Sequence, residues 1–270
     1  MHHGAAGRPW YDLLSDPAAR SAVWRNESFR SRFSSRPRLA RRDIRPTSIL
    51  DSGYVTGLQP QREMLQARQE HFPLSFTSLG LSEILCHSVA RLGYQQPTPV
   101  QEQSIPIVLA GSDLLARAHT GTGKTAAFGL PMIDRLLVRS QRRAGSRAPG
   151  GLVLVPMREL AIQVHRALAT YGAPVNLRAT AIYGGVGMRP QRDALRRGVD
   201  IIVATPGRLI DHMEQRSVDL SGLEILTLDE ADRMLDLGFL PPLRRILAAL
   251  PHARQTLLFS ATLSSEVTRL

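Results

Sequence analysis

Short apolar runs alternate with helical patterns along most of this chain, and this alternation limits its fold more than any other feature. Six runs are typical of buried strands: 114–118, 152–155, 179–183, 201–204, 224–228 and 256–259. Helical patterns lie between them, for example at 125–139, 158–171, 188–197 and 207–215. Such an order predicts a parallel sheet covered by helices on both faces. We therefore expect one α/β domain from residue 72 to residue 270.

A polar motif follows each apolar run. In chain order these motifs read HTGTGKT, PMRELA, GG, TPGR, DEAD and SAT. The carboxyl ends of parallel strands lie along one edge of the sheet, where α/β proteins bind ligands. The six motifs are therefore predicted to line one cleft.

The first motif, within GSDLLARAHTGTGKT at 111–125, is typical of a phosphate loop between a strand and a helix. Gly121 and Gly123 allow the backbone N–H groups to turn toward a polyphosphate at the helix N-terminus. Lys124 is then expected to reach the phosphates and the Thr125 hydroxyl to bind Mg²⁺. Ala118 stands where the strict pattern has glycine, and an ordinary glycine-rich turn is the alternative.

The choice of lysine at this position favours the phosphate loop. Lys124 is the only lysine among 34 Lys and Arg residues. A composition that strongly favours arginine has kept a compact ammonium here, and the planar guanidinium is not an equivalent phosphate ligand.

Two carboxylates follow the fifth run. Asp229 and Glu230 are predicted to project toward the phosphate loop, where Asp229 would bind Mg²⁺ with Thr125, directly or through water. Glu230 would orient or deprotonate an attacking water. The alternative is a pair of solvated acids at a helix N-terminus.

Residues 1–71 differ from the rest of the chain because they lack sustained apolar periodicity. Seven arginines and one acid lie between Arg30 and Arg45, with aromatic residues nearby, and this composition predicts a flexible extension. The arginines could contact RNA, or they could be a solvated tail. Organelle transit peptides contain few acidic residues, so Asp12, Asp16 and Glu27 argue against that function.

From Phe76 to Leu270 the sequence resembles the first RecA-like lobe of a DEAD-box RNA helicase. Four segments carry the resemblance. They are GYQQPTPVQ at 93–101 with Phe76 upstream, AHTGTGKT at 118–125, DEAD at 229–232 and SAT at 260–262.

The resemblance implies ATP and Mg²⁺ as cofactors and assigns roles to residues of this chain. Gln101 would read the adenine edge, which glutamine geometry permits, and Phe76 would stack on its face. The remaining ATP-binding residues would be Ala118, His119, Thr120, Gly121, Thr122, Gly123, Lys124 and Thr125, with Lys124, Asp229 and Glu230 catalytic. Asp232, Ser260 and Thr262 would couple the nucleotide to unwinding.

The resemblance also implies contacts to the RNA sugar-phosphate backbone, with little base specificity. These residues would be Pro156, Arg158, Gly184, Gly185, Thr205, Pro206, Gly207 and Arg208. The chemistry agrees, because guanidinium forks, a hydroxyl and an accessible glycine backbone suit phosphate contacts. The preference for RNA over DNA rests on the resemblance alone.

Three residues depart from the family pattern. His119 stands where glutamine is usual, Met157 where threonine is usual, and Leu263 where methionine is common. Leu263 is a mild apolar change. Met157 lacks a hydroxyl that would face an RNA phosphate, so we expect weaker RNA affinity.

Leu270 follows the SAT motif closely, so no sequence remains for the second RecA-like lobe that supplies arginine fingers in the family. We therefore expect little hydrolysis or unwinding from this chain alone. Two alternatives stay open. The chain could be a nucleotide-independent RNA- or partner-binding adaptor that uses its Arg-rich arm, or a DNA-directed relative.

Net charge and cysteine content indicate the type of partner and the cellular compartment. The formal net charge of +11 favours a polyanionic partner without identifying it. The resemblance implies that this partner is RNA, as a single strand or short duplex. No apolar run is long enough to span a bilayer, and the one cysteine, Cys86, fits a reducing compartment. We expect a cytoplasmic monomer that also binds helicase partner proteins.

Overall fold

The computed structural model describes residues 49–51, 75–142 and 148–270. All of them belong to one compact unit, Pro46–Leu270. Apart from residues 49–51, the predicted extension at 1–71 lies outside the described residues. The Arg- and Gly-rich composition of residues 140–150 also predicts an exposed loop, and its residues 143–147 lie outside them too.

The described residues form a sheet in which every strand pair is parallel. The strands are β1 (Ile49–Asp51), β2 (Leu114–Arg117), β3 (Gly151–Leu154), β4 (Ala179–Ile182), β5 (Ile201–Ala204), β6 (Ile225–Asp229) and β7 (Gln255–Ser260). Their order is β1-β2-β7-β6-β3-β5-β4. The six predicted strands are present, with ends that differ by at most one residue. The predicted RecA-like α/β fold is confirmed.

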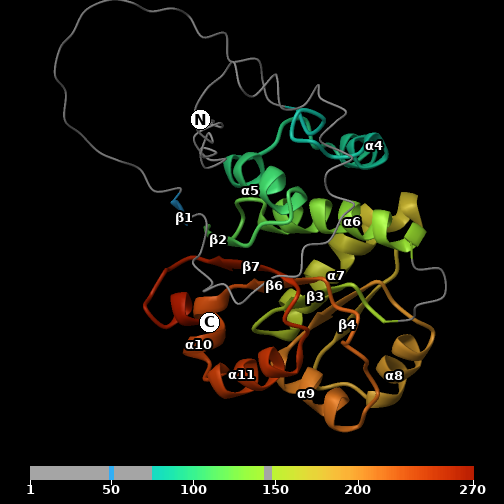
Figure 1. The fold of residues 1–270 in the computed structure, drawn as a ribbon, viewed down its shortest axis with the longest axis vertical. Coiled ribbons are helices and arrows are strands. Elements are labelled where there is room, and N and C mark those ends of the chain that lie inside the picture. The colour runs from blue at the N-terminus through green and yellow to red at the C-terminus, as the bar shows by residue number, and fades with distance from the viewer. Residues whose placement is uncertain (1–48, 52–74, 143–147) are drawn as a thin grey trace, which may run out of the picture. The chain divides into compact units, whose positions relative to one another are not determined.

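Helices cover both faces of this sheet (Figure 1). The first layer contains α4 (Glu83–Arg91), α5 (Pro99–Leu109), α6 (Lys124–Arg142) and α7 (Arg158–Gly172). The second contains α8 (Met188–Arg196), α9 (Pro206–Glu214), α10 (Ala231–Asp236) and α11 (Leu240–Ala249). Within the described part of the chain, no helix has the length and apolarity needed to cross a membrane.

The strands separate two hydrophobic cores because successive side chains point to opposite faces. In β3, Leu152 and Leu154 pack with the α8–α11 layer, and Val153 packs with the α4–α7 layer. All three side chains are fully buried. The central strands therefore consist almost entirely of apolar residues, which explains the continuous runs in the sequence.

Four elements differ from the sequence expectations. β1 lies inside the stretch predicted to be a flexible extension and pairs with β2. Helices α5 and α11 were not predicted, and α6 continues to Arg142, into the predicted loop. Helix α5 begins with Pro99 after a Thr98 capping box, a local start signal that the apolar periodicity did not reveal.

Candidate nucleotide and nucleic-acid site

The motifs meet along the carboxyl edge of the sheet through bonds just beyond the strands. The Ala118 N–H donates to the Ser260 carbonyl (2.9 Å), which joins the phosphate loop to the SAT segment. The Thr205 N–H donates to the Ile182 carbonyl (2.9 Å), which joins TPGR to the strand before the glycine pair. The strand order thus separates two groups, one around β2, β7 and β6, the other around β3, β5 and β4.

Two glycines shape the phosphate loop. Gly121 and Gly123 have φ of 86° and 92°, in the left-handed region that favours glycine. A Cβ at Gly123 would collide with the Gln101 amide nitrogen and lie 3.1 Å from Thr98 Oγ1. The loop therefore needs glycine at 123 for both its conformation and its packing.

Gln101 holds this loop from the start of α5. Its side chain is 1% exposed. Its Oε1 accepts from the Thr98 N–H (2.9 Å), and its Nε2 donates to the Gly123 carbonyl (3.1 Å). Each end of the amide still has one unused bonding position among the described residues.

Lys124, at the start of α6, forms a buried ion pair. Its Nζ lies 3.4 Å from Asp229 Oδ1, and the two side chains are 6% and 3% exposed. That oxygen accepts no hydrogen bond from the described residues. Burial raises the pKa of the Asp229 carboxyl, and the nearby Glu230 adds to this, while the Lys124 ammonium lowers it. The two charges are thus buried together, and the free Asp229 oxygen leaves a bonding position that a bound cation could use.

Glu230 adopts an unusual backbone conformation. Its φ of 55° and ψ of 52° are left-handed, which costs a non-glycine residue about 1 kcal/mol or more. Its Oε1 accepts from the Thr120 hydroxyl (2.9 Å), and Oε2 lies 3.6 Å from Arg233 Nη1. The strained backbone turns this carboxylate toward the phosphate loop, beside the Lys124–Asp229 pair. Strain of this kind is typical of functional sites.

Asp232 links the DEAD and SAT segments. Its Oδ2 accepts from the Thr262 N–H (2.9 Å) and hydroxyl (3.1 Å), and its own N–H donates to Ser260 Oγ (3.2 Å). Burial alone would raise the pKa of the Asp232 carboxyl, but bonds from Thr262 and Ser260 hold it below its ordinary value. The structure thus brings together the three residues predicted to act in coupling.

Phe76 lies in the core instead of facing solvent. It is 5% exposed and meets the Tyr94 ring edge-on, with centroids 6.2 Å apart. An open pocket of about 530 Å³ is lined by Leu92, Gly93, Tyr94, Gln95 and Gln96. The predicted stacking of Phe76 on adenine stays a prediction.

The second group of motifs converges on Arg158, at the start of α7. Its guanidinium lies over the Tyr183 ring, 5.3 Å from the centroid. A Cβ at Gly185, whose φ is 78°, would lie 3.5 Å from Arg158 Nη1. An exposed guanidinium thus lies beside an accessible glycine backbone, an arrangement suited to phosphate.

Arg208, on α9, is tied to the same loop. Its Nη1 donates to the Val186 carbonyl (2.9 Å), and its Nε lies 3.2 Å from Asp211 Oδ2. The side chain is only 12% exposed. Arg208 therefore braces the loop after the glycine pair, in addition to any phosphate contact.

Comparison with known proteins identifies the family. The model of the DEAD/DEAH box helicase family matches residues 98–270. The chain belongs to this family. It is 44% identical over 211 residues to the ATP-dependent rRNA helicase rrp3 of Aspergillus fumigatus, an alignment that covers 78% of this chain and 43% of that protein.

Other DEAD/DEAH box relatives match at similar levels. The rrp3 of Botryotinia fuckeliana is 47% identical over 200 residues, covering 74% of this chain and 40% of the relative. The probable ATP-dependent RNA helicase ddx27 of Dictyostelium discoideum is 44% identical over 211 residues, covering 78% and 26%. The chain spans about two fifths of the length of the rrp3 relatives.

The donor set suits the Mg²⁺ that the helicase family implies. Asp229 offers a buried carboxylate oxygen without a hydrogen bond, and the half-buried Thr125 follows Lys124 in the first turn of α6. Hydroxyl and carboxylate oxygens are the ligands that Mg²⁺ prefers, with phosphates and water completing its shell. Among the described residues no cluster of three or more His, Cys, Asp or Glu could hold a metal alone.

A buried polar network in this DEAD/DEAH box domain was not predicted. His212 is fully buried on α9, its Nδ1 2.7 Å from Ser217 Oγ and its Nε2 3.3 Å from Gln191 Oε1. Gln191 Nε2 donates to the Tyr183 carbonyl (3.0 Å). The helical period indicates that His212 and Gln191 face inward, but their hydrogen-bond partners lie on other elements and are not visible in the local sequence.

This network predicts a pH dependence of stability. Burial lowers the pKa of His212 from its ordinary 6.5, and Arg208 and Arg192 add to this while Asp211 opposes it. The unfolded chain therefore takes up the proton first as pH falls, so stability present above pH 6.5 is lost below it, by up to about 1.4 kcal/mol per pH unit. Urea unfolding at pH 7.5 and 5.5 should show wild type losing more stability than His212→Gln. Equal pH slopes would contradict this.

Met157 is the N-terminal capping residue of α7 and makes no side-chain capping bond. Met157→Thr should stabilise the domain by about 1 kcal/mol, because a threonine oxygen can accept a bond from the first helical turn. The same hydroxyl should strengthen RNA binding by about 0.5–1.5 kcal/mol. Thermal unfolding and RNA titration measure the two effects. Met157→Val, which has the same shape without the hydroxyl, is the control and should show neither gain.

Proposed function

We propose that this domain binds ATP with Mg²⁺ and the sugar-phosphate backbone of RNA, as the first RecA-like lobe of an ATP-dependent RNA helicase. The main support is the buried Lys124–Asp229 pair beside the strained Glu230 and next to the left-handed glycines of the phosphate loop. A structural ion pair alone would not need an adjacent glycine-rich loop or a strained carboxylate. The helicase names of the relatives agree with this proposal.

In the proposed nucleotide site, the Lys124 ammonium turns from Asp229 to the β and γ phosphates. Asp229 and Thr125 would hold Mg²⁺, which would neutralise charge on the phosphates. Glu230 positions the attacking water and takes its proton. Gln101 uses its remaining amide positions for the adenine edge.

In the proposed RNA site, Arg158 and the Gly184–Gly185 backbone contact phosphates, with Thr205 through Arg208 completing the surface. The support is the convergence of Arg158, Tyr183 and Gly185. Contacts of this type follow the backbone and carry little base specificity.

The link from Asp232 to Thr262 is the proposed coupling element, because it joins the segment that would sense the nucleotide to the end of β7. The described domain alone is expected to hydrolyse ATP slowly. The cytoplasmic location, the monomeric state and the partner proteins stay predictions.

The test is a pair of binding titrations on the full chain, one with a fluorescent ADP analogue and Mg²⁺, the other with single-stranded RNA. We expect both ligands to bind, and unlabelled RNA to compete better than DNA of equal length. A chain lacking residues 1–70 should keep nucleotide binding. Collapse of RNA affinity in that variant, with no nucleotide binding in either protein, would instead support the adaptor function. Equal competition by DNA would support a DNA-directed relative.

A further inference from the structure

Helix α8 has two opposite faces. Gln191 is buried and Leu195 packs against the core, whereas Arg189, Arg196 and Arg197 are exposed. Residues 189, 196 and 197 fall within about 100° of one another around a helix of 3.6 residues per turn, on the side away from Gln191. The helix therefore presents a cluster of arginines to solvent, with Asp193 as its one acid.

The arginine face has a fixed position relative to the proposed RNA site. Gln191, on the buried face, donates to the Tyr183 carbonyl and lies 3.3 Å from the buried His212. Tyr183 is the residue over which Arg158 stacks. One buried network thus joins α8 to the loop that carries Gly184 and Gly185.

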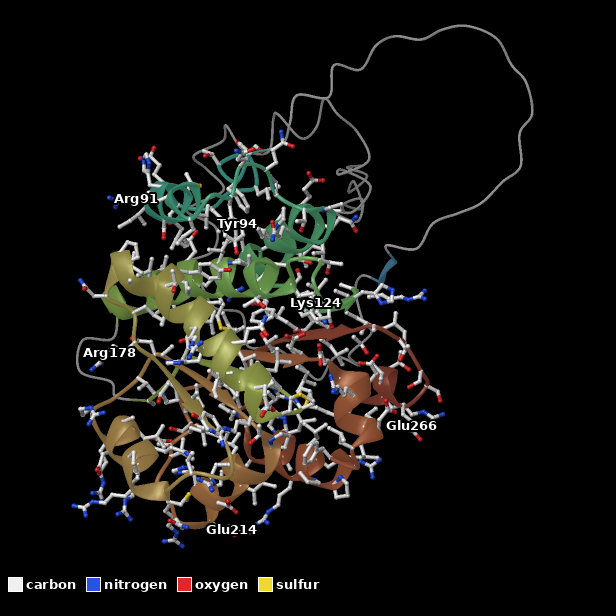
Figure 2. All side chains as sticks on the ribbon, turned by 180° about the vertical axis from the view of Figure 1, so that it is seen from behind. Arg91, Tyr94, Lys124, Arg178, Glu214 and Glu266 are labelled. Carbon is white, nitrogen blue, oxygen red and sulfur yellow. The ribbon has the colours of Figure 1, made fainter. Side chains whose placement is uncertain are left out.

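The positive surface continues beyond the far end of α8. The Arg178 Nη1 donates to the Arg197 carbonyl (3.1 Å), and the Arg178 side chain remains 60% exposed although Asp200 lies 4.0 Å away. Arg178 lies well away from Lys124 (Figure 2), on the β4 side of the sheet. The exposed arginines therefore form a track along α8, from Arg189 in its first turn to Arg197 and Arg178 at its far end, with Asp193 between them.

The length of this track matches several phosphates. A helix of nine residues is about 14 Å long. A stacked strand carries a phosphate about every 3.4 Å along its axis, so about four phosphates could lie beside it. A small organic anion would need a concave site, whereas an extended polyanion suits an exposed helix face.

We propose that the α8 track, Arg178, Arg189, Arg196 and Arg197, binds the backbone of RNA that extends beyond the proposed RNA site. This inference rests on the proposed function, because it assigns the track to the same strand. The track adds affinity only for RNA long enough to reach it. It therefore sets a length dependence of binding without base specificity.

The test compares two oligouridylates, of about 6 and about 16 nucleotides, with spans of roughly 20 and 54 Å at stacked spacing. In the triple variant Arg189→Gln/Arg196→Gln/Arg197→Gln, affinity for the longer RNA should fall about tenfold. The slope of log K against log salt should become shallower by about 2, since each lost phosphate contact accounts for about 0.7. Affinity for the short RNA should change less than twofold.

The control removes the same charge from exposed arginines elsewhere, as Arg91→Gln/Arg244→Gln/Arg269→Gln. It should leave the length dependence intact. The proposal is overturned if the α8 variant binds both RNAs like wild type or if its affinities for the two RNAs fall equally. It is also overturned if the control variant loses as much affinity for the longer RNA as the α8 variant. If the α8 substitutions weaken binding of poly-glutamate but not of RNA, the surface would instead bind an acidic protein, and the proposal would also be wrong.

The two proposals fail in different ways. If wild type binds neither RNA, the proposed RNA-binding function itself is wrong, and the proposal for the α8 track is wrong with it. If wild type binds the short RNA and has no higher affinity for the longer one, only the proposal for the α8 track is wrong.

Discussion

Lys124→Ala is expected to weaken Mg-dependent nucleotide binding by roughly ten- to 150-fold, because charge-assisted bonds to phosphate contribute about 1.5–3 kcal/mol. Titration with a fluorescent ADP analogue measures the loss. Lys124→Arg should also bind poorly, since the guanidinium fork does not fit a loop built for a compact ammonium. Arg91→Ala, an exposed cation on α4, is the control and should bind like wild type. Nucleotide affinity within threefold of wild type for Lys124→Ala would mean that the loop is not a phosphate site.

The same substitution should change stability, because it leaves Asp229 buried without its ion-pair partner. We expect a loss of about 1–3 kcal/mol, smaller than for a fixed buried charge because Asp229 can accept a proton. Asp229→Asn in the Lys124→Ala background should recover part of this loss. A double-mutant cycle by urea unfolding measures the coupling. A coupling energy near zero would show that the pair contributes little to the folded domain.

The strands and their polar ends could be predicted because both depend on local sequence. Buried parallel strands consist of continuous apolar residues, as in Leu152 to Leu154, and the motif after each strand must lie at the carboxyl edge. Asp229, the last residue of β6, therefore follows from its position in the sequence. Its partnership with Lys124 depends on the strand order, in which only β7 separates β2 from β6.

Helix α5 could not be predicted from periodicity. Its apolar residues do not gather on one face, and Pro106 lies inside it. Gln101 bonds to Gly123, which lies 22 residues along the chain, so no local pattern shows that this amide supports the phosphate loop. The local signals of this helix were the capping box of Thr98 and Gln101 and the proline at its first position.

The second group of motifs, around β3, β5 and β4, was also only partly predictable from the sequence. Arg208 was predicted only as a phosphate ligand, yet its bond to Val186 and its ion pair with Asp211 brace the loop. Tyr183, read in the sequence as the end of a strand, is the residue over which Arg158 stacks. Such double roles depend on contacts between distant segments and become visible only in the folded domain.

Glu230→Gln is expected to lower RNA-stimulated ATP hydrolysis by about 10²- to 10⁴-fold, the usual contribution of a general base. The amide keeps an oxygen for the Thr120 hydroxyl bond and does not alter the left-handed backbone, so the site should stay folded. Nucleotide affinity should therefore remain close to that of wild type. Single-turnover hydrolysis, with the chain in excess over ATP, detects turnover even where it is slow.

The result separates chemistry from binding at Glu230, the one acidic residue with a left-handed backbone in the part of the chain that the structure describes. Turnover by Glu230→Gln within tenfold of a measurable wild-type rate would remove Glu230 from the chemical step and leave its strain without a catalytic explanation. If wild type shows no turnover above the variant while both bind nucleotide and RNA, the lobe binds its ligands without completing a catalytic site. Arginine groups aimed at the γ-phosphate contribute about 10³–10⁵ in rate in related phosphoryl transfer, and adding them from another lobe should then restore a rate that Glu230→Gln abolishes.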